Sequence, residues 1–159
     1  MKKMQSYTKD IQFDLIVPGV KAISHKQALL TMAQKSAEFL NIREKIMCER
    51  ISSKEKLGNS AIGNGIAIPH FKMRRIQSPF TLLMTLHNEI KHETPDGTNI
   101  DLYCLLISPL NDGPIHLRRL SRLSRLFKND TLRKRIRETQ DPDIVHSLLM
   151  DPQGWFMAA

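Results

Sequence analysis

Residues 57–70 read LGNSAIGNGIAIPH. Glycines interrupt the first part of this stretch and the short apolar run 66–68 follows them, which predicts a loop that leads into a short buried strand. Pro69 ends the run, because it offers no N–H for strand pairing and favours an extended backbone at Ile68. The stretch therefore predicts an imidazole, His70, at the tip of a strand, a rigidly held position that suits a reactive side chain.

The sequence before this stretch predicts two helices. Ser24 is a suitable helix cap and Gln27 completes a capping-box pattern. Apolar residues at helical spacing then extend the first helix over 25–40, and a second helix is predicted over 43–54. Closer to the N-terminus we expect a short helical turn within 11–17, ended by Pro18-Gly19, and a β-compatible segment at 20–23.

The sequence after residue 70 predicts strands and then helices. The runs 80–86 and 102–107 are strand candidates, and the second is apolar enough for the middle of a sheet. Helices are predicted from Gly113 to about residue 149, with Pro114 in the first turn of one and Asp141 at the start of another. The apolar stripe of the first consists of Leu117, Leu120, Leu123, Leu126 and Phe127. This order of elements predicts one α/β layered domain, a mixed β-sheet flanked by helices on both faces.

Length and composition indicate an ordinary globular domain. The chain has 159 residues, of which 41% are hydrophobic. We expect a flexible N-terminal segment at 1–10, the domain at 11–150 and a C-terminal tail at 151–159. No secretory signal and no run of the ~20 apolar residues that a membrane span needs is recognisable, so we predict a cytoplasmic protein without membrane insertion. Cys48 and Cys104 lack a metal-like spacing and are expected to be reduced thiols.

Positive charge is concentrated near the C-terminus. The chain carries 24 lysines and arginines against 16 acidic residues, a formal charge of +8. Such a surface could neutralise the phosphates of a nucleic acid. However, no DNA-binding motif surrounds it and aromatic residues for stacking are scarce, so a solvated helix face is favoured and an acidic protein partner is the next reading. The basic residues concerned are Arg118, Arg119, Arg122, Arg125, Lys128, Arg133, Lys134, Arg135 and Arg137.

The glycines of 57–70 do not form a dinucleotide-binding loop. Gly63-x-Gly65 is two-thirds of that fingerprint, the third glycine is missing, and a strand-like run follows where a helix should begin. The stretch 62–70 instead resembles the active-site signature of the fructose/mannitol-type IIA domains (EIIA type 2) of the bacterial phosphoenolpyruvate:sugar phosphotransferase system. It is most similar to the nitrogen-regulatory branch. The similarity covers roughly 12–150 and includes the strand candidate 102–109 and the segment 115–121.

The resemblance implies a fold and a chemistry. It implies the EIIA mannitol/nitrogen-regulatory fold and a phosphotransferase component without cofactor or metal, in which His70 accepts a phosphoryl group from an HPr-like phosphocarrier. It also implies that His116 is a second active-site histidine. A neutral imidazole suits this chemistry, because it keeps a lone pair near neutral pH and phosphoryl transfer mainly requires positioning. Residues expected to support the phosphate or the site are Lys54, Ser60, Gly63 and Gly65.

His116 stands two residues after Pro114, in the first turn of a predicted helix. Unpaired backbone N–H groups at such a position attract anions. We therefore hypothesise that this helix end and His116 together hold the phosphoryl oxygens. The alternative is a histidine that caps the helix or packs in the core.

Three positions depart from the family pattern. Lys54 stands where relatives carry an arginine and lacks its two-pronged donor geometry. Ala61 and Phe71 both stand where glycine is common. Three functions therefore stay open: a regulatory IIA protein that signals through phosphorylation-dependent binding to target proteins, a sugar-specific IIA component that passes phosphate to a IIB protein, and a IIA-like interaction module that is not phosphorylated.

The other histidines show no metal-binding pattern. They fit no ligand spacing such as i, i+4 on one helix, although sequence alone does not rule out a zinc site assembled from distant residues. We expect these side chains at the surface or at helix ends, and no metal site is predicted. They are His25, His87, His92 and His146.

Overall fold

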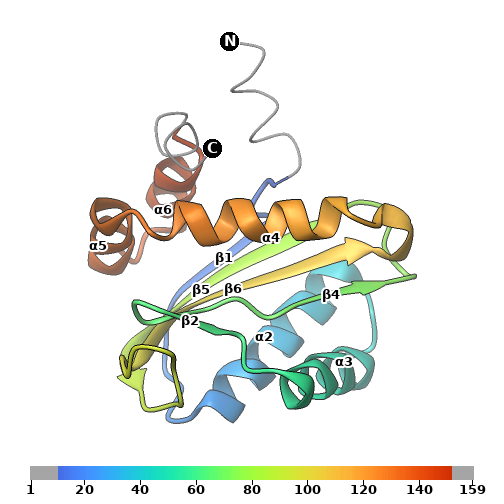
Figure 1. Cartoon of the computed structure of the whole chain (residues 1–159), viewed down its shortest axis with the longest axis horizontal. Coiled ribbons are helices and arrows are strands. Elements are labelled where there is room, and N and C mark those ends of the chain that lie inside the picture. The colour runs from blue at the N-terminus through green and yellow to red at the C-terminus, as the bar shows by residue number, and fades with distance from the viewer. Residues whose placement is uncertain (1–10, 152–159) are drawn as a thin grey trace.

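A six-stranded mixed β-sheet lies between two layers of helices in the computed structural model, which describes residues 11–151 (Figure 1). The flexible segment predicted at 1–10 and the predicted tail 151–159, apart from Asp151, lie outside the described residues. In chain order the elements are β1 (Leu15–Val20), α2 (His25–Leu40), α3 (Glu44–Leu57), β2 (Ala61–Gly63), β3 (Ile66–Ala67), β4 (His70–Met73), β5 (Phe80–Ile90), β6 (Ile100–Pro109), the 3₁₀ turn η1 (Leu110–Asp112), α4 (Ile115–Leu126), α5 (Asp130–Glu138) and α6 (Pro142–Leu149).

The sheet is built around β5 and β6, which pair antiparallel. On one side β1 pairs parallel with β5, and on the other side β3 and β4 both pair parallel with β6. The short β2 completes this side by pairing antiparallel with β3. Every residue of β6 except Asp101 is buried, as expected for the apolar run that the sequence placed in the middle of a sheet.

Each face of the sheet packs against its own helices (Figure 1). On one face α2 and α3 cover a core that contains Leu82, Met84 and Tyr103. On the other face α4, α5 and α6 cover a core that contains Leu83 and Leu102. Successive residues of β5 thus point to opposite cores, which is the period of two that a strand imposes. The predicted mixed sheet with helices on both faces is confirmed.

The helix boundaries follow the predicted signals closely. The Ser24 side chain accepts a hydrogen bond from the backbone N–H of Gln27 at 3.1 Å, and α2 covers the predicted range. The Gln27 side chain accepts from the backbone N–H of Ile23, at 3.0 Å, and so closes the box one residue earlier than expected. The second helix extends to Leu57, three residues beyond the prediction.

The helical turn predicted within 11–17 is wrong, because β1 occupies Leu15–Val20. The Pro18-Gly19 pair does not end an element here. It shifts the register of β1 against β5 between Val17 and Val20. Gly19 takes a φ of +69° and donates its N–H to the Thr85 hydroxyl at 3.0 Å. An edge strand tolerates such a bulge, because only one of its sides pairs with a neighbour.

The predicted apolar stripe of α4 is partly wrong. Leu117 is 63% exposed, whereas the neighbouring Arg119 is 5% exposed. The face of α4 that packs on the sheet carries His116, Arg119, Leu123 and Leu126. The first two residues of this buried face, His116 and Arg119, are therefore polar, and both belong to the site described next.

Candidate active site

His70 lies just after the break between β3 and β4, the two short strands that pair with the same side of β6. The segments β3 and β4 both pair parallel with β6, with Ala67 opposite Tyr103 and His70 opposite Leu106. Between them, Pro69 cannot donate a hydrogen bond, but its carbonyl accepts one from the N–H of Leu106 at 3.0 Å. His70 therefore begins β4, held by its pairing with β6, and does not end the strand before it.

The structure brings His70 and His116 together although 46 positions separate them in the sequence. The Nδ1 atom of His70 lies 3.1 Å from the Nε2 atom of His116, within hydrogen-bond distance. His116 is in the first turn of α4 and is 5% exposed, whereas His70 is partly exposed. The buried ring therefore lies behind the accessible one.

A chain of polar groups holds His116 from the other side. Its Nδ1 atom lies 2.7 Å from the Ser108 hydroxyl at the end of β6. Arg119 donates to this hydroxyl at 2.9 Å and to the Asp112 carboxylate at 2.6 Å. Both nitrogens of the His116 ring thus have partners, and its orientation is fixed.

Sequence reasoning missed Ser108, Asp112 and the inward role of Arg119. Arg119 could have been found, because it stands three residues after His116 and so shares its helix face. Ser108 and Asp112 gave no such signal, since nothing in their local sequence marks them as partners of a histidine.

Both imidazoles are held in the neutral form. Burial, followed by the charge of Lys54, lowers the pKa of His70, and Glu55 opposes this only in part. Burial also lowers the pKa of His116, to about 4, with contributions from His70, Lys72 and Arg119. Near neutral pH each ring therefore carries one N–H and one nitrogen with a lone pair.

A cleft of about 170 Å³ opens beside His70. Lys54 and Glu55 reach it from the last turn of α3, and Ser60 reaches it from the loop that follows. Ser60 donates to Glu55 from its hydroxyl at 3.1 Å and from its backbone N–H at 3.3 Å. Of the described residues, those that line the cleft are Lys54, Glu55, Leu57, Gly58, Asn59, Ser60, Pro69 and His70.

Gly63 and Gly65 are not among these lining residues. They take φ values of +97° and +78° at the turn between β2 and β3. A Cβ on Gly65 would lie 2.7 Å from a guanidinium nitrogen of Arg137, which donates to the carbonyl of Asn64 at 2.8 Å. The two glycines therefore shape the hairpin that precedes His70, and the structure does not bring them to the cleft.

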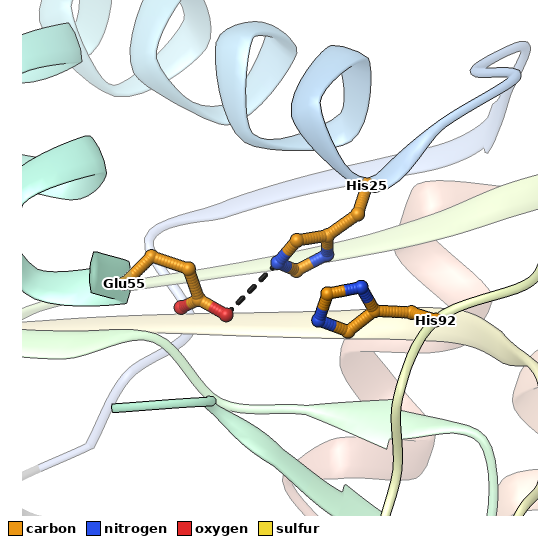
Figure 2. Close-up of side chains that lie close together, drawn as sticks. All are labelled: His25, Glu55 and His92. Carbon is orange, nitrogen blue, oxygen red and sulfur yellow. Dashed lines mark hydrogen bonds and ion pairs between the residues drawn. The ribbon is translucent and has the colours of Figure 1, made fainter. Parts of the chain in front are cut away.

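A second group of ionisable side chains lies next to Glu55. His25 at the start of α2 and His92 after β5 meet this carboxylate (Figure 2). Among the histidine, cysteine and acidic residues of the described chain, these three form the group whose possible ligand atoms lie close enough together to hold a metal ion. Sequence spacing gave no sign of this group, because its members come from three separate segments.

Comparison with known proteins identifies relatives of this chain. A family model described as "Phosphoenolpyruvate-dependent sugar phosphotransferase system, EIIA 2" matches residues 11–151. A nitrogen regulatory protein of Bradyrhizobium diazoefficiens is 37% identical over 139 residues, which is 87% of this chain and 91% of that protein. The nitrogen regulatory protein of Escherichia coli is 29% identical over 132 residues, 82% of this chain and 81% of that protein.

Solved structures resemble the chain in fold. The nitrogen regulatory protein IIA-Ntr of Neisseria meningitidis superposes with a TM-score of 0.77 at 21% identity, covering 85% of this chain and 92% of that one. The IIA mannitol structure of Escherichia coli gives a TM-score of 0.70 at 19% identity, covering 84% and 94%. These likenesses confirm the mannitol/nitrogen-regulatory fold. Among the described residues, no helix combines the length and apolar character needed to cross a membrane.

Proposed function

Because the chain belongs to the EIIA 2 family of the phosphoenolpyruvate-dependent sugar phosphotransferase system, we propose that it is a phosphoryl carrier with His70 as the acceptor. The observation that carries this proposal is the pairing of His70, which lines the cleft, with the buried His116 ring. One nitrogen of the acceptor ring is occupied and the other is left for chemistry.

The hydrogen-bond chain supports Nε2 of His70 as the attacking atom. Ser108 already accepts from Arg119 and has a second lone pair that can accept from Nδ1–H of His116. His116 Nε2 then accepts from Nδ1–H of His70, so that the lone pair of His70 lies on Nε2. A lone pair fixed in this way is the arrangement that an imidazole nucleophile requires.

The transfer exchanges one nitrogen–phosphorus bond for another. His70 Nε2 attacks the phosphorus of a donor phosphohistidine, and the bond between the donor imidazole and phosphorus breaks as the new bond forms. The electron pair of the broken bond stays on the donor imidazole, which takes up one proton for the one that the phosphorylated His70 ring gives up, so atoms and charge balance. The step is nearly balanced in energy, because a phosphoimidazole is both the reactant and the product. Lys54, which lines the cleft, supplies positive charge to the phosphoryl oxygens.

We assign His116 a positioning role. The hypothesis drawn from the sequence had placed its ring on the phosphoryl oxygens, but both ring nitrogens have other partners, His70 and Ser108. His116 therefore orients the acceptor ring and fixes its tautomer, in the way that a carboxylate orients a catalytic histidine.

A protein partner is favoured over a small substrate. Large apolar side chains are exposed in the segments that carry the site: Leu57 at the cleft is 84% exposed, and Ile115 and Leu117, the sequence neighbours of His116, are 39% and 63% exposed. Exposed apolar residues beside a reactive group are typical of a docking surface. We propose an HPr-like phosphocarrier as the donor and regulatory target proteins as the readers of the phosphorylated state. The nitrogen regulatory relatives favour this over transfer to a IIB protein.

Mass spectrometry tests this function directly. The chain is incubated with phosphoenolpyruvate, Enzyme I and the phosphocarrier, and an added mass of about 80 Da is expected on the peptide that contains His70. His70→Ala should abolish the gain, whereas His87→Ala, which removes an exposed histidine of β5, should not. If the wild-type chain gains no mass, the protein is an interaction module and the carrier proposal fails.

A further inference from the structure

The side chains of His25, Glu55 and His92 lie close together (Figure 2). Nε2 of His25 lies 2.9 Å from Oε1 of Glu55, and the His92 ring stacks on the His25 ring with 3.8 Å between centroids. One donor atom from each residue lies within 4.8 Å of the other two. Their side chains come from the start of α2, the last turn of α3 and the segment after β5.

We propose that these three side chains bind a divalent transition-metal ion of the zinc class, with a further position left open to water. Two imidazoles and one carboxylate are a ligand set that such ions take, and three protein ligands leave a coordination position free. Magnesium and calcium prefer oxygen ligands throughout, so a site with two nitrogen donors selects against them. This site departs from the sequence-based expectation that the chain has no metal site.

Two of the three donors already lie close to the spacing that an ion requires, whereas the His92 ring, now stacked on His25, would have to turn its nitrogen toward the same point. Zinc binds nitrogen at about 2.0–2.1 Å and carboxylate oxygen at about 2.0–2.2 Å, which places tetrahedral donors roughly 3.3 Å apart. The pair formed by His25 and Glu55 is already close to that separation, at 2.9 Å. Their side chains are 11% and 13% exposed, so the ion would lie at a site largely shielded from water but still reachable.

An outer partner already supports the His25 ring. Its Nδ1 atom lies 2.7 Å from the Tyr103 hydroxyl. Burial raises the pKa of Tyr103, which keeps this group a neutral hydroxyl that can donate or accept. Without metal, Nε2–H of His25 donates to Glu55 and the Tyr103 hydroxyl donates to Nδ1. With metal, Nδ1–H donates to Tyr103 and the Nε2 lone pair binds the ion, a change of tautomer without a change of charge.

Glu55 connects this group to the cleft beside His70. Its Oε1 atom accepts from His25 and also from Ser60, and Glu55 lines the cleft. Burial opposes ionisation of Glu55, but hydrogen bonds from His25 and Ser60 outweigh it and lower its pKa, so the carboxylate is charged. A bound ion would therefore lie beside the cleft that His70 lines. Binding itself does not depend on phosphoryl transfer.

Calorimetric titration of the chelator-treated, unphosphorylated chain with Zn²⁺ tests the proposal. We expect one equivalent to bind, excess Mg²⁺ not to compete, and Co²⁺ to give visible absorption bands of a low-coordinate site. His92→Ala should weaken binding by more than about 100-fold, because even loss of an outer-shell partner costs about 10–100-fold. Tyr103→Phe, which keeps the buried ring, should weaken it about 10-fold or more. The matched control His87→Ala removes an exposed histidine of β5 and should leave binding unchanged.

A His70→Ala variant locates the ion. The rings of His70 and His116 form a second pair of imidazoles in the described chain, and they could capture zinc themselves. Retained binding in His70→Ala, with loss in His92→Ala, supports the site at Glu55. Loss in His70→Ala with retention in His92→Ala overturns it, and so does a wild-type chain that binds no zinc at micromolar concentration.

Discussion

Replacing His116 by alanine tests whether this residue positions the acceptor. The ring is 5% exposed and takes part in two hydrogen bonds, with His70 at 3.1 Å and with Ser108 at 2.7 Å. A hydrogen bond contributes about 1 kcal/mol net, and a small cavity adds to the loss, so His116→Ala should lower the free energy of unfolding by about 2–3 kcal/mol. Ser108 keeps Arg119 as a donor, which limits the damage.

The same substitution should slow phosphorylation of His70 by about 10- to 100-fold. Loss of the bond to His116 removes about 1 kcal/mol of preference for the tautomer with the lone pair on Nε2, which is about fivefold in its population. The freed ring can also rotate, and misplacement of a reacting atom by about 1 Å can cost up to about 100-fold. His116→Gln should recover part of the rate, because its amide oxygen can accept from Nδ1–H of His70.

Single-turnover transfer from the phosphorylated carrier, followed by quenched-flow mass spectrometry, measures this rate. Urea unfolding of the same samples separates lost stability from lost positioning. His87→Ala is the matched control and should show neither effect. An unchanged transfer rate in a folded His116→Ala protein would refute the positioning role, as would a His116→Gln protein no faster than His116→Ala.

Three further outcomes follow from the described contacts. Burial depresses the pKa of His116 from 6.5 to about 4, so the unfolded chain binds a proton more readily than the folded one. The contribution of the neutral His116 to the free energy of unfolding should therefore be fully present above pH 6.5 and fall by up to about 3 kcal/mol towards pH 4. Urea titrations at several pH values measure this loss, which His116→Gln should reduce. Arg119→Met leaves Asp112 without its buried partner and should cost about 2–4 kcal/mol by denaturant unfolding, whereas Arg118→Met on the exposed face should cost little. Gly65→Ala should destabilise by about 1–3 kcal/mol more than Gly97→Ala in thermal unfolding. Both glycines have positive φ, but an added Cβ at Gly65 would lie 2.7 Å from Arg137 and 3.1 Å from the carbonyl oxygen of Asn99, whereas one at Gly97 would meet nothing within 4 Å.

The fold could be predicted where the local signal and the tertiary packing agree. The cap at Ser24 and the apolar run of β6 both report on their own segments, and the structure confirms the elements they predicted. The prediction for the segment of β1 was wrong because Pro18-Gly19 locally favours a break, whereas the pairing of β1 with β5 accommodates a bulge there. The prediction that Leu117 belongs to the buried stripe of α4 was wrong for a related reason. Helical spacing alone does not tell which of two overlapping stripes packs on the sheet when one of them contains His116 and Arg119.

The site was predictable only in part, because its contacts are not local. The motif that ends in Pro69-His70 drew attention to the proposed acceptor, and the resemblance to IIA domains suggested His116. Nothing in the sequence joins His25 to His92, since the sheet and two helices bring them together only after folding. Residues that act through distant partners carry no spacing signal of their own.

The positive charge of the chain is consistent with a phosphoryl acceptor once its placement is known. Burial is the main cause of the lowered pKa of both histidines; Lys54 adds to it at His70, and Lys72 and Arg119 add to it at His116. Each of these cations disfavours an imidazolium and so keeps a lone pair available, and the same positive charge would favour the anionic phosphoryl group in the proposed transfer. A lysine in place of the family's arginine at position 54 preserves this field while giving up a bidentate grip on the phosphate. Compared with an arginine, Lys54 should therefore reduce the binding of the phosphoryl oxygens more than it reduces the reactivity of the His70 nitrogen.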